Sequence, residues 1–440
     1  MSRYLEPIEV ASREGMQAFQ LAKLQEQVQH AYANSPFYRR KFDQAGVKPE
    51  QIQSLDDLRR LPFTTKEDLK ESQAANGLFG DFLAVPLEQC LRLHQTSGTT
   101  GHPVRVLDTE QDWYGFYHMY ARALYAMGVR KSDVVVTFFS HGPWIGYWSG
   151  FHAAQDLGCL VIPTGGMSTE QRIQLLLDFP ITVVGCTPSY ALYMAEEARK
   201  KGIDLARDTK VRITWHTGEP GAGLPGTKRQ IEQAFGAKCF DLPGLTEIAA
   251  WGFECEAQSG MVHAHEDYVY PEVLNPETGE PVKPGERGEL VFTSLYRKAM
   301  PFLRYRTKDI VELSAEPCPC GRTLVAFKGG VVGRTDDMKK VRGVIVYPSR
   351  IEEVVRQFDE VDEFFITIHR VSGLDDILVQ IDPRPGLSAD TVAHIQESIA
   401  DALRVALGIR ATVEMKEPGT LPRWDHKAKR FKDIRTEVPF

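Results

Sequence analysis

The middle of the chain alternates between short apolar runs and longer amphipathic segments. The apolar runs have the length and the β-branched content of buried strands; they are residues 134–139, 159–162, 181–186, 211–215 and 238–242. The segments between them have helical spacing and are residues 147–157, 169–179, 189–201 and 227–235. Such alternation predicts right-handed βαβ units and a parallel sheet, whose ligands bind at the carboxyl ends of its strands.

Different patterns flank this region. Leu24, Val28 and Tyr32 recur every four residues and predict an N-terminal helix. Thr64 followed by Glu67 predicts a capping box at the start of another helix. The runs at 288–293 and 302–311 predict strands of an antiparallel layer.

A small α+β segment is expected at the C-terminus. Its predicted helices are residues 349–358 and 388–407, and its predicted strands are residues 364–369, 377–381 and 411–415. We therefore expect an α/β protein with two domains, a large one at residues 1–335 and a small one at residues 336–440. The large domain should combine the parallel sheet with the antiparallel strands.

Composition narrows the class of protein. Of the 440 residues, 42% are hydrophobic and 25% are charged, which is typical of a soluble globular protein. The net charge of −7 argues against a nucleic-acid surface and against a polybasic membrane anchor. The first residues lack the apolar core of a signal peptide, no apolar run could span a bilayer, and seven cysteines do not suggest a disulfide framework. We expect a cytoplasmic enzyme.

A loop rich in hydroxyl groups and glycine is the clearest chemical signal. Glycine lets backbone amides converge on an anion, and hydroxyl groups add further donors. The loop consists of Thr96, Ser97, Gly98, Thr99, Thr100 and Gly101. It could hold the β- and γ-phosphates of ATP, although no Gly-Lys-Ser/Thr follows as in a Walker A loop. Taken alone, it could equally be an ordinary polar turn.

Several further motifs occur in a characteristic order. They are Ser35–Phe42, Leu61–Lys66, Ser97–Gly101, Thr187–Tyr190, Gly218–Pro220, Gly244–Glu247, Tyr305–Asp309, Gly333–Asp337, Leu421–Arg423 and Lys427. In their order and spacing the chain resembles phenylacetate–CoA ligases, within the superfamily of adenylate-forming acyl-CoA synthetases. The resemblance implies two steps: a carboxylate attacks the α-phosphorus of ATP to give an acyl-adenylate and pyrophosphate, and CoA then displaces AMP. It implies ATP, Mg²⁺ and CoA as cofactors and a mobile C-terminal domain.

The resemblance also implies roles for residues around the nucleotide. The loop at 96–101 would cradle the phosphates, and Gly218-Glu219-Pro220 would line the adenine pocket. Thr246 would bond the α-phosphate, Glu247 would hold Mg²⁺, and Asp309 would accept the ribose hydroxyls. Without the resemblance, Thr246 and Glu247 fit a helix N-terminus, and Asp309 fits a solvated ion pair with the preceding lysine.

The mobile domain would contribute further groups. By the same resemblance, Arg334 contacts the ribose and phosphate region, Asp336 is the hinge, and Lys427 bridges the carboxylate and the α-phosphate during adenylation. Lys429 is the alternative to Lys427. The chain departs from the family pattern at three positions, which are Pro243 in place of tyrosine, Lys308 in place of glycine and His426 in place of glycine.

The resemblance places the acid in an aromatic environment. The candidate contacts are His141, Trp144, Trp148, Gly166 and His216. Aromatic walls suit a small apolar acid such as phenylacetate or benzoate. A compact hydroxy or branched acid is the alternative, because bulky residues can shrink the pocket. The two tryptophans could equally be core residues, since they lie at helical spacing.

Three cysteines and one histidine could form a structural zinc site. Cys255, His263, Cys318 and Cys320 offer the complete tetrahedral donor set, with no position left open for catalysis. His265 could replace His263. The alternative is four independent residues with reduced thiols.

Three classes of function remain open from the sequence. The first is an ATP-dependent acid–CoA ligase, acting on a small carboxylic acid and possessing no nucleic-acid or membrane partner. The second is an adenylyltransferase with an acceptor other than CoA, and the third is a non-catalytic nucleotide-binding protein. A homodimer is compatible with each of them.

Overall fold

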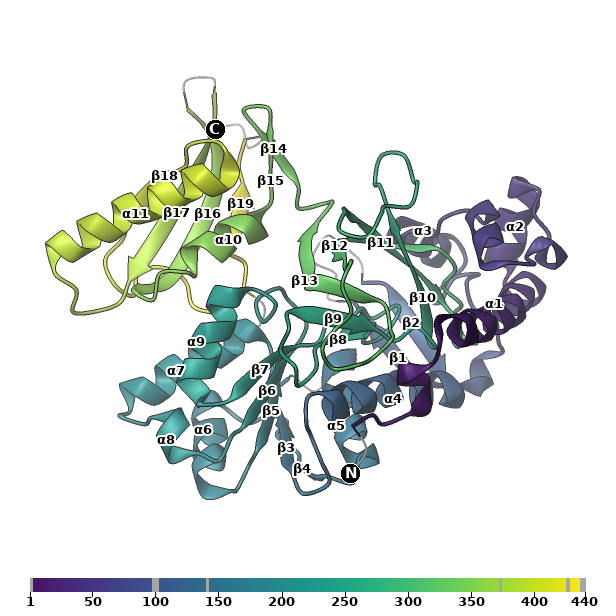
Figure 1. The fold of residues 1–440 in the computed structure, drawn as a ribbon, viewed down its shortest axis with the longest axis horizontal. Helices are drawn as coiled ribbons and strands as arrows, with labels where there is room; N and C mark the ends of the chain where they lie inside the picture. The colour runs from purple at the N-terminus through teal and green to yellow at the C-terminus, as the bar shows by residue number, and fades with distance from the viewer. Residues whose placement is uncertain (1–2, 97–102, 140–141, 372–373, 425–427, 436–440) are drawn as a thin grey trace.

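The computed structural model describes residues 3–96, 103–139, 142–371, 374–424 and 428–435 (Figure 1). A large N-terminal part contains a parallel sheet, an antiparallel sheet and their helices, and a small C-terminal part lies beside α7 and α9. The α/β fold and the small C-terminal unit confirm the expected fold class. Within the described residues, no helix combines the length and apolar character needed to cross a bilayer.

Helices dominate the first part of the chain. They are α1 (Arg13–Asn34), α2 (Pro36–Ala45) and α3 (Lys66–Ala75), with the short 3₁₀ helices η1 (Pro7–Val10), η2 (Pro49–Gln51), η3 (Leu55–Arg60) and η4 (Leu87–Gln89). Leu24 and Val28 are fully buried, as the four-residue spacing predicts. Ser35 ends α1 and caps α2, because its Oγ accepts the Tyr38 amide at 3.4 Å.

The predicted capping box is wrong by one residue. Thr65, not Thr64, caps α3, and its partner is Asp68, not Glu67. The Thr64 hydroxyl instead donates to the Leu303 carbonyl at 2.8 Å in the core. Thr64 also forms a β-bridge with the antiparallel sheet, and this pairing takes the place of the predicted helix cap.

The parallel sheet has five strands in the order β4-β3-β5-β6-β7, and every neighbouring pair is parallel. The strands are β3 (Val134–Thr137), β4 (Leu160–Ile162), β5 (Val183–Cys186), β6 (Ile213–His216) and β7 (Lys238–Asp241). The helices of this region are α4 (Glu110–Ala126), α5 (Ile145–Asp156), α6 (Thr169–Asp178), α7 (Pro188–Lys200), α8 (Leu205–Asp208) and α9 (Pro225–Phe235). The predicted alternation of strands and helices is confirmed.

A six-stranded sheet has the order β10-β11-β12-β13-β9-β8, and its pairs are antiparallel. Its strands are β8 (Gly252–Phe253), β9 (Met261–Ala264), β10 (Val269–Leu274), β11 (Arg287–Ser294), β12 (Tyr305–Leu313) and β13 (Ala326–Arg334). The strand expected from residue 302 begins only at Tyr305, because Arg304 has a left-handed backbone with φ +46°. A separate hairpin consists of β1 (Cys90–Gln95) and β2 (Arg105–Thr109).

Among its described residues, the C-terminal part has a hairpin, a four-stranded sheet and two helices. Its elements are β14 (Lys339–Val341), β15 (Val344–Val346), α10 (Pro348–Val355), β16 (Val361–Val371), β17 (Leu374–Pro383), α11 (Ala389–Leu407), β18 (Thr412–Met415) and β19 (Phe431–Asp433). The sheet order is β18-β17-β16-β19. The sequence pattern missed β14, β15 and β19, which are only three residues long.

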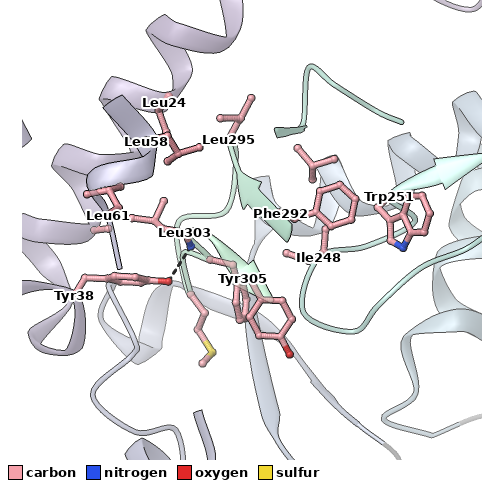
Figure 2. Packing of buried hydrophobic residues seen from close by; sticks show 14 of the residues in the cluster. Leu24, Tyr38, Leu58, Leu61, Ile248, Trp251, Phe292, Leu295, Leu303 and Tyr305 are labelled. Carbon is pink, nitrogen blue, oxygen red and sulfur yellow. Dashed lines mark hydrogen bonds between the residues drawn. The ribbon is translucent and has the colours of Figure 1, made fainter. Parts of the chain in front are cut away.

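A buried tyrosine joins the N-terminal helices to the antiparallel sheet (Figure 2). Tyr38 is 1% exposed, and its Oη accepts the Leu303 amide at 2.9 Å and donates to the Pro301 carbonyl at 3.0 Å. Leu24 and Leu61 belong to the same apolar cluster as Phe292 of the sheet. The phenol oxygen therefore provides a hydrogen-bond acceptor for a buried backbone amide, which the surrounding apolar side chains could not provide.

Replacing Tyr38 with phenylalanine should destabilise the N-terminal part by about 1–3 kcal/mol, since the Leu303 amide would stay buried without an acceptor. The free energy of unfolding from urea titration measures the effect. The control is Tyr114→Phe, because Tyr114 is 47% exposed and should tolerate the change. Equal stability of the two variants would contradict the assigned role of the Tyr38 hydroxyl.

Candidate active site

Three neighbouring strands of the parallel sheet end at the same edge. Cys186 of β5 is in register with His216 of β6, and His216 is in register with Asp241 of β7. The segments that follow these strands contain Thr187–Tyr190 at the start of α7, Gly218-Glu219-Pro220 and Gly244–Glu247. Strand register therefore brings together three motifs that are distant in sequence.

Glu247 is a buried carboxylate on the last of these loops. It is 4% exposed, and the Tyr305 hydroxyl donates to its Oε1 at 3.1 Å. Thr246 and Glu247 lie in a tight turn closed by the Ala249 amide, which donates to the Leu245 carbonyl at 2.9 Å. The alternative of a helix N-terminus is therefore wrong. The sequence analysis assigned no role to Tyr305, although this residue begins the Tyr305–Asp309 motif and its position there indicated a functional site.

Asp309 and Arg334 face each other on adjacent strands. They are paired in the register of β12 and β13, and Arg334 Nη1 lies 2.6 Å from Asp309 Oδ1. Arg334 Nε also donates to Asp336 Oδ1 at 3.0 Å. Burial raises the pKa of Asp309 to about 6, even though the guanidinium of Arg334 opposes that shift. This carboxylate is only 5% exposed, so it is not part of a solvated pair with Lys308.

Lys308 has an unusual backbone conformation. Its φ of +67° lies in the left-handed region, which glycine adopts with less strain. The Lys308 amide donates to Glu289 Oε1 at 3.2 Å, and its ammonium lies 3.4 Å from Glu67. The left-handed backbone at this position therefore explains why the family pattern has glycine here. The ammonium of Lys308 lies near Glu67 and not near Asp309.

Glu219 connects two parts of the molecule. Its Oε1 accepts the Ser189 amide at 2.8 Å in the first turn of α7, and its Oε2 accepts the Ala428 amide at 2.9 Å. Gly218, before it, has φ +95°, and Pro220 follows. The predicted catalytic Lys427 lies outside the described residues, directly before Ala428. Lys429, the alternative, has an exposed side chain.

Thr96 closes the base of the predicted phosphate loop. Its Oγ1 accepts the Val104 amide at 3.1 Å, and its own amide donates to the Val104 carbonyl at 3.0 Å. The remaining loop positions lie outside the described residues; they are Ser97, Gly98, Thr99, Thr100 and Gly101. The contacts of Thr96 therefore fix where the loop leaves β1 and returns toward β2.

A buried charged network holds this hairpin. His94 Nδ1 lies 2.8 Å from Asp108 Oδ2, and Arg297 Nη2 lies 2.6 Å from Asp108 Oδ1. All three side chains are at most 1% exposed. Buried charges are tolerated only when they are paired and hydrogen-bonded, so the network specifies the position of the hairpin. Single-residue patterns gave no signal for this network, because its members are distant in sequence.

The two predicted acid-binding tryptophans differ in their surroundings. Trp148 Nε1 donates to the Gly142 carbonyl at 2.9 Å, and the guanidinium of Arg92 lies 4.8 Å from the Trp148 ring. The other side of Arg92 faces Trp113 at 4.3 Å. Trp148 is therefore a packing partner of Arg92, whereas Trp144 is 38% exposed at the start of α5.

The other acid-binding candidates lie on three separate segments of the chain. His216 is fully buried; its Nδ1 lies 3.0 Å from the Cys186 carbonyl, and burial lowers its pKa to about 4. Gly166 lies in an exposed turn with φ +75°. His141 lies outside the described residues. His216 is therefore a neutral group at the strand edge, while Gly166 belongs to the surface.

The four predicted zinc ligands come together. The Sγ atoms of Cys255 and Cys318 are 3.7 Å apart, and Cys320 Sγ lies 3.4 Å from His263 Nε2. All four ligand atoms lie within 4.8 Å of one another, and all four residues are buried. Zn–S bonds of about 2.3 Å in a tetrahedron require sulfur atoms about 3.8 Å apart. His265 lies against Arg122 instead, so it does not replace His263.

Comparison with known proteins identifies the family. The AMP-binding enzyme model matches residues 18–296, and the AMP-binding enzyme C-terminal domain matches residues 343–435. Phenylacetate–CoA ligases of Pseudomonas putida and Thermus thermophilus are each 36% identical, over 98% of this chain and 97% and 99% of theirs. The chain belongs to this ligase family. It is an AMP-forming acid–CoA ligase, which activates a carboxylate as acyl-adenylate and transfers the acyl group to CoA.

Solved structures of a relative in two states resemble the ligase to different extents. A 2-hydroxyisobutyryl-CoA ligase in the postadenylation state gives a TM-score of 0.94 at 32% identity, covering 99% of this chain and 93% of that one. In the thioesterification state the same enzyme gives 0.75 over the same coverage. An anthranilate–CoA ligase at 19% identity and a TM-score of 0.56 shares the fold. The domain arrangement here is therefore closer to that of the postadenylation state.

Changing Asp309 to asparagine should remove one component of the pH dependence of folding. A carboxyl whose pKa is about 6 when folded binds its proton more tightly than in the unfolded chain, so its contribution to stability declines as pH rises from about 4 to 6. The component is on the order of 3 kcal/mol at most. Urea titrations of both proteins between pH 4 and pH 8 measure it. Parallel stability curves would contradict the raised pKa.

Proposed function

We propose that this ligase activates a small carboxylic acid of the phenylacetate class at the common edge of β5, β6 and β7. The observation that carries the proposal is that Glu219 and Glu247 follow β6 and β7 at this edge, where Glu219 bonds the C-terminal tail and Glu247 bonds β12, the strand of the Asp309–Arg334 pair. The phenylacetate–CoA ligases at 36% identity favour an aryl acid. A compact hydroxy acid is the second candidate, favoured by the close likeness to the 2-hydroxyisobutyryl-CoA ligase.

Each motif at this edge would serve one part of ATP. Donors of the loop at 96–101 would surround the β- and γ-phosphates without a fixed charge, so that pyrophosphate can leave. The backbone of Gly218-Glu219-Pro220 would border adenine, and Asp309 with Arg334 would hold the ribose. Glu247, with Thr246 beside it, would bind Mg²⁺, since a buried carboxylate suits a hard cation. The bound cation would neutralise charge on the phosphates.

The C-terminal domain would deliver the cation for adenylation. We assign residues 1–335 to the N-terminal domain and residues 336–440 to the mobile domain, with Asp336 as the hinge. Lys427 would bridge the acid and the α-phosphate, since the neighbouring Ala428 amide is bonded to Glu219. Proximity and orientation are the main contribution of such a group, so its position matters more than its basicity.

Pyrophosphate exchange tests the reaction and the acid together. Exchange of labelled pyrophosphate into ATP should appear with phenylacetate or benzoate, and addition of CoA should yield free AMP and a thioester. Lys427→Ala should reduce exchange by at least about 100-fold and spare thioester formation from a preformed acyl-adenylate. Exchange by Lys427→Ala at the wild-type rate would contradict the role of this lysine. Exchange with 2-hydroxyisobutyrate and none with aryl acids would favour the second candidate.

We further propose that Cys255, His263, Cys318 and Cys320 bind a structural Zn²⁺. The donor set and its spacing fit tetrahedral coordination, and the Arg322 amide donates to Cys320 Sγ at 3.4 Å, as expected around a thiolate. The cluster would fasten the loop at 318–321 to β9. Nearby, the Tyr4 hydroxyl donates to the Cys320 carbonyl at 2.9 Å, so the N-terminal segment depends on the same loop.

Cys318→Ser should lower the zinc content from about one ion per chain and reduce thermal stability, because structural zinc contributes directly to folding. Elemental analysis of protein purified without chelators measures the metal, and calorimetry measures the stability. Cys90→Ser is the matched control, since Cys90 is a half-buried thiol outside the cluster. Wild-type protein without metal would overturn the zinc assignment.

A cytoplasmic location fits the seven cysteines, none of which forms a disulfide within the described residues, as is typical of a reducing compartment. A homodimer stays a prediction of the sequence.

A further inference from the structure

Several polar groups join the C-terminal domain to the N-terminal domain. Arg229 of α9 donates to the Gln357 carbonyl and to Asp359, each at 3.1 Å. Arg423 lies 3.5 Å from Glu196 of α7. Ser349 of α10 donates to the Val332 carbonyl of β13 at 3.1 Å. Two further contacts lie at the first turn of α7, where the tail after Lys427 meets Ser189 and Glu219.

Glu219 is held in place before the tail arrives. Its Oε1 accepts the Ser189 amide, which belongs to the first turn of α7 and has no acceptor within that helix. A carboxylate at this position is also favoured by the positive end of the helix dipole. The second oxygen, Oε2, is then aimed at the Ala428 amide, 2.9 Å away. Glu219 therefore presents a fixed acceptor to the backbone next to Lys427.

Arg430 makes the second contact from the same tail. Its Nη1 donates to Ser189 Oγ at 3.1 Å, while Nε and Nη2 bind the two oxygens of Glu363 at 2.7 and 2.9 Å. The Arg430 carbonyl accepts the Ile366 amide at 2.7 Å, which joins the tail to β16. Arg430 is thus rigid within its own domain and reaches across to Ser189.

We propose that Ser189 and Glu219 form a docking node that recognises the tail backbone and so positions Lys427 for adenylation. Glu219 is then a positioning residue, whose carboxylate acts through the Ala428 amide rather than on the nucleotide. The inference rests on the proposed function for the role of Lys427. It adds a second task to Gly218-Glu219-Pro220, which the resemblance assigns to the adenine pocket alone.

The node belongs to one domain orientation. Any rotation of the C-terminal domain away from α7 breaks the contacts of Ala428 and Arg430 together, because both lie on the short segment that precedes β19. Weakening the node should therefore slow the adenylation half-reaction and leave the second half-reaction intact. A residue that only maintained the fold or the adenine pocket would impair both half-reactions.

Glu219→Gln is the sharpest test. Glutamine has the same shape, but its single amide oxygen cannot accept from both Ser189 and Ala428, so one backbone N–H would face an NH₂ group. Pyrophosphate exchange with phenylacetate and with 2-hydroxyisobutyrate should fall about 10-fold or more. Thioester formation from preformed acyl-adenylate and CoA should stay within about 2-fold, and the Kd for AMP should not change.

Ser189→Ala provides a second, milder variant, because it removes only the Arg430 contact and keeps the Ser189 amide. It should lower exchange in the same selective way. Glu417→Gln is the control for loss of one negative charge, since Glu417 is exposed on the C-terminal domain. Equal loss of both half-reactions, or a weaker Kd for AMP in Glu219→Gln, would overturn the proposal.

A conformational measurement separates failure of the node from failure of the proposed function. Dyes attached through unnatural amino acids at the exposed positions Lys210 and Glu397 report the distance between the domains by energy transfer. In the presence of Mg²⁺ and ATP, Glu219→Gln should populate the docked arrangement less than wild type and Glu417→Gln. This result would support the node even if no acid supported exchange. A docked population in Glu219→Gln equal to that of wild type would overturn it.

Discussion

The parallel register of β5, β6 and β7 is the constraint on which the site depends. Each strand is four residues long, and their last residues, Cys186, His216 and Asp241, are partners in the strand register. The segments that follow these three strands therefore all begin at the same edge of the sheet, although they are far apart in the sequence. The helix α7 starts directly after β5, so its first turn lies at this edge and offers free amides to a carboxylate from the next loop.

The antiparallel sheet supplies the other half of the site through buried side chains. Tyr305 and Asp309 both lie on β12, one bonded to Glu247 and the other to Arg334 of β13. Neither carboxylate is exposed by more than 5%. Keeping these charges out of water costs free energy unless a donor or cation compensates them. Ligands that supply hydroxyl donors and a metal cation would offset this free-energy cost when they bind.

Periodicity predicted the architecture because strand and helix repeats depend on local sequence alone. The five parallel strands and the helices between them follow from runs such as 181–186 and 227–235. Local patterns failed where a long-range partner decided the outcome. Thr64 was expected to cap a helix, but its hydroxyl bonds the Leu303 carbonyl. The Cys/His cluster was predictable, because three thiols and one imidazole form a complete tetrahedral donor set.

Polar contacts between the two domains matter for a ligase that catalyses two steps. Arg229, Asp359 and Arg423 form contacts that are at least partly exposed, and exposed ion pairs contribute only about 0–1 kcal/mol each. An apolar interface of the same extent would hold the two domains in one orientation. Hydrogen bonds between the domains can be exchanged for hydrogen bonds to water, so they allow the C-terminal domain to change its orientation. The node at Glu219 differs, since its carboxylate is held in place by α7 in advance. A few directed bonds can therefore define where the tail docks without making the docked state permanent.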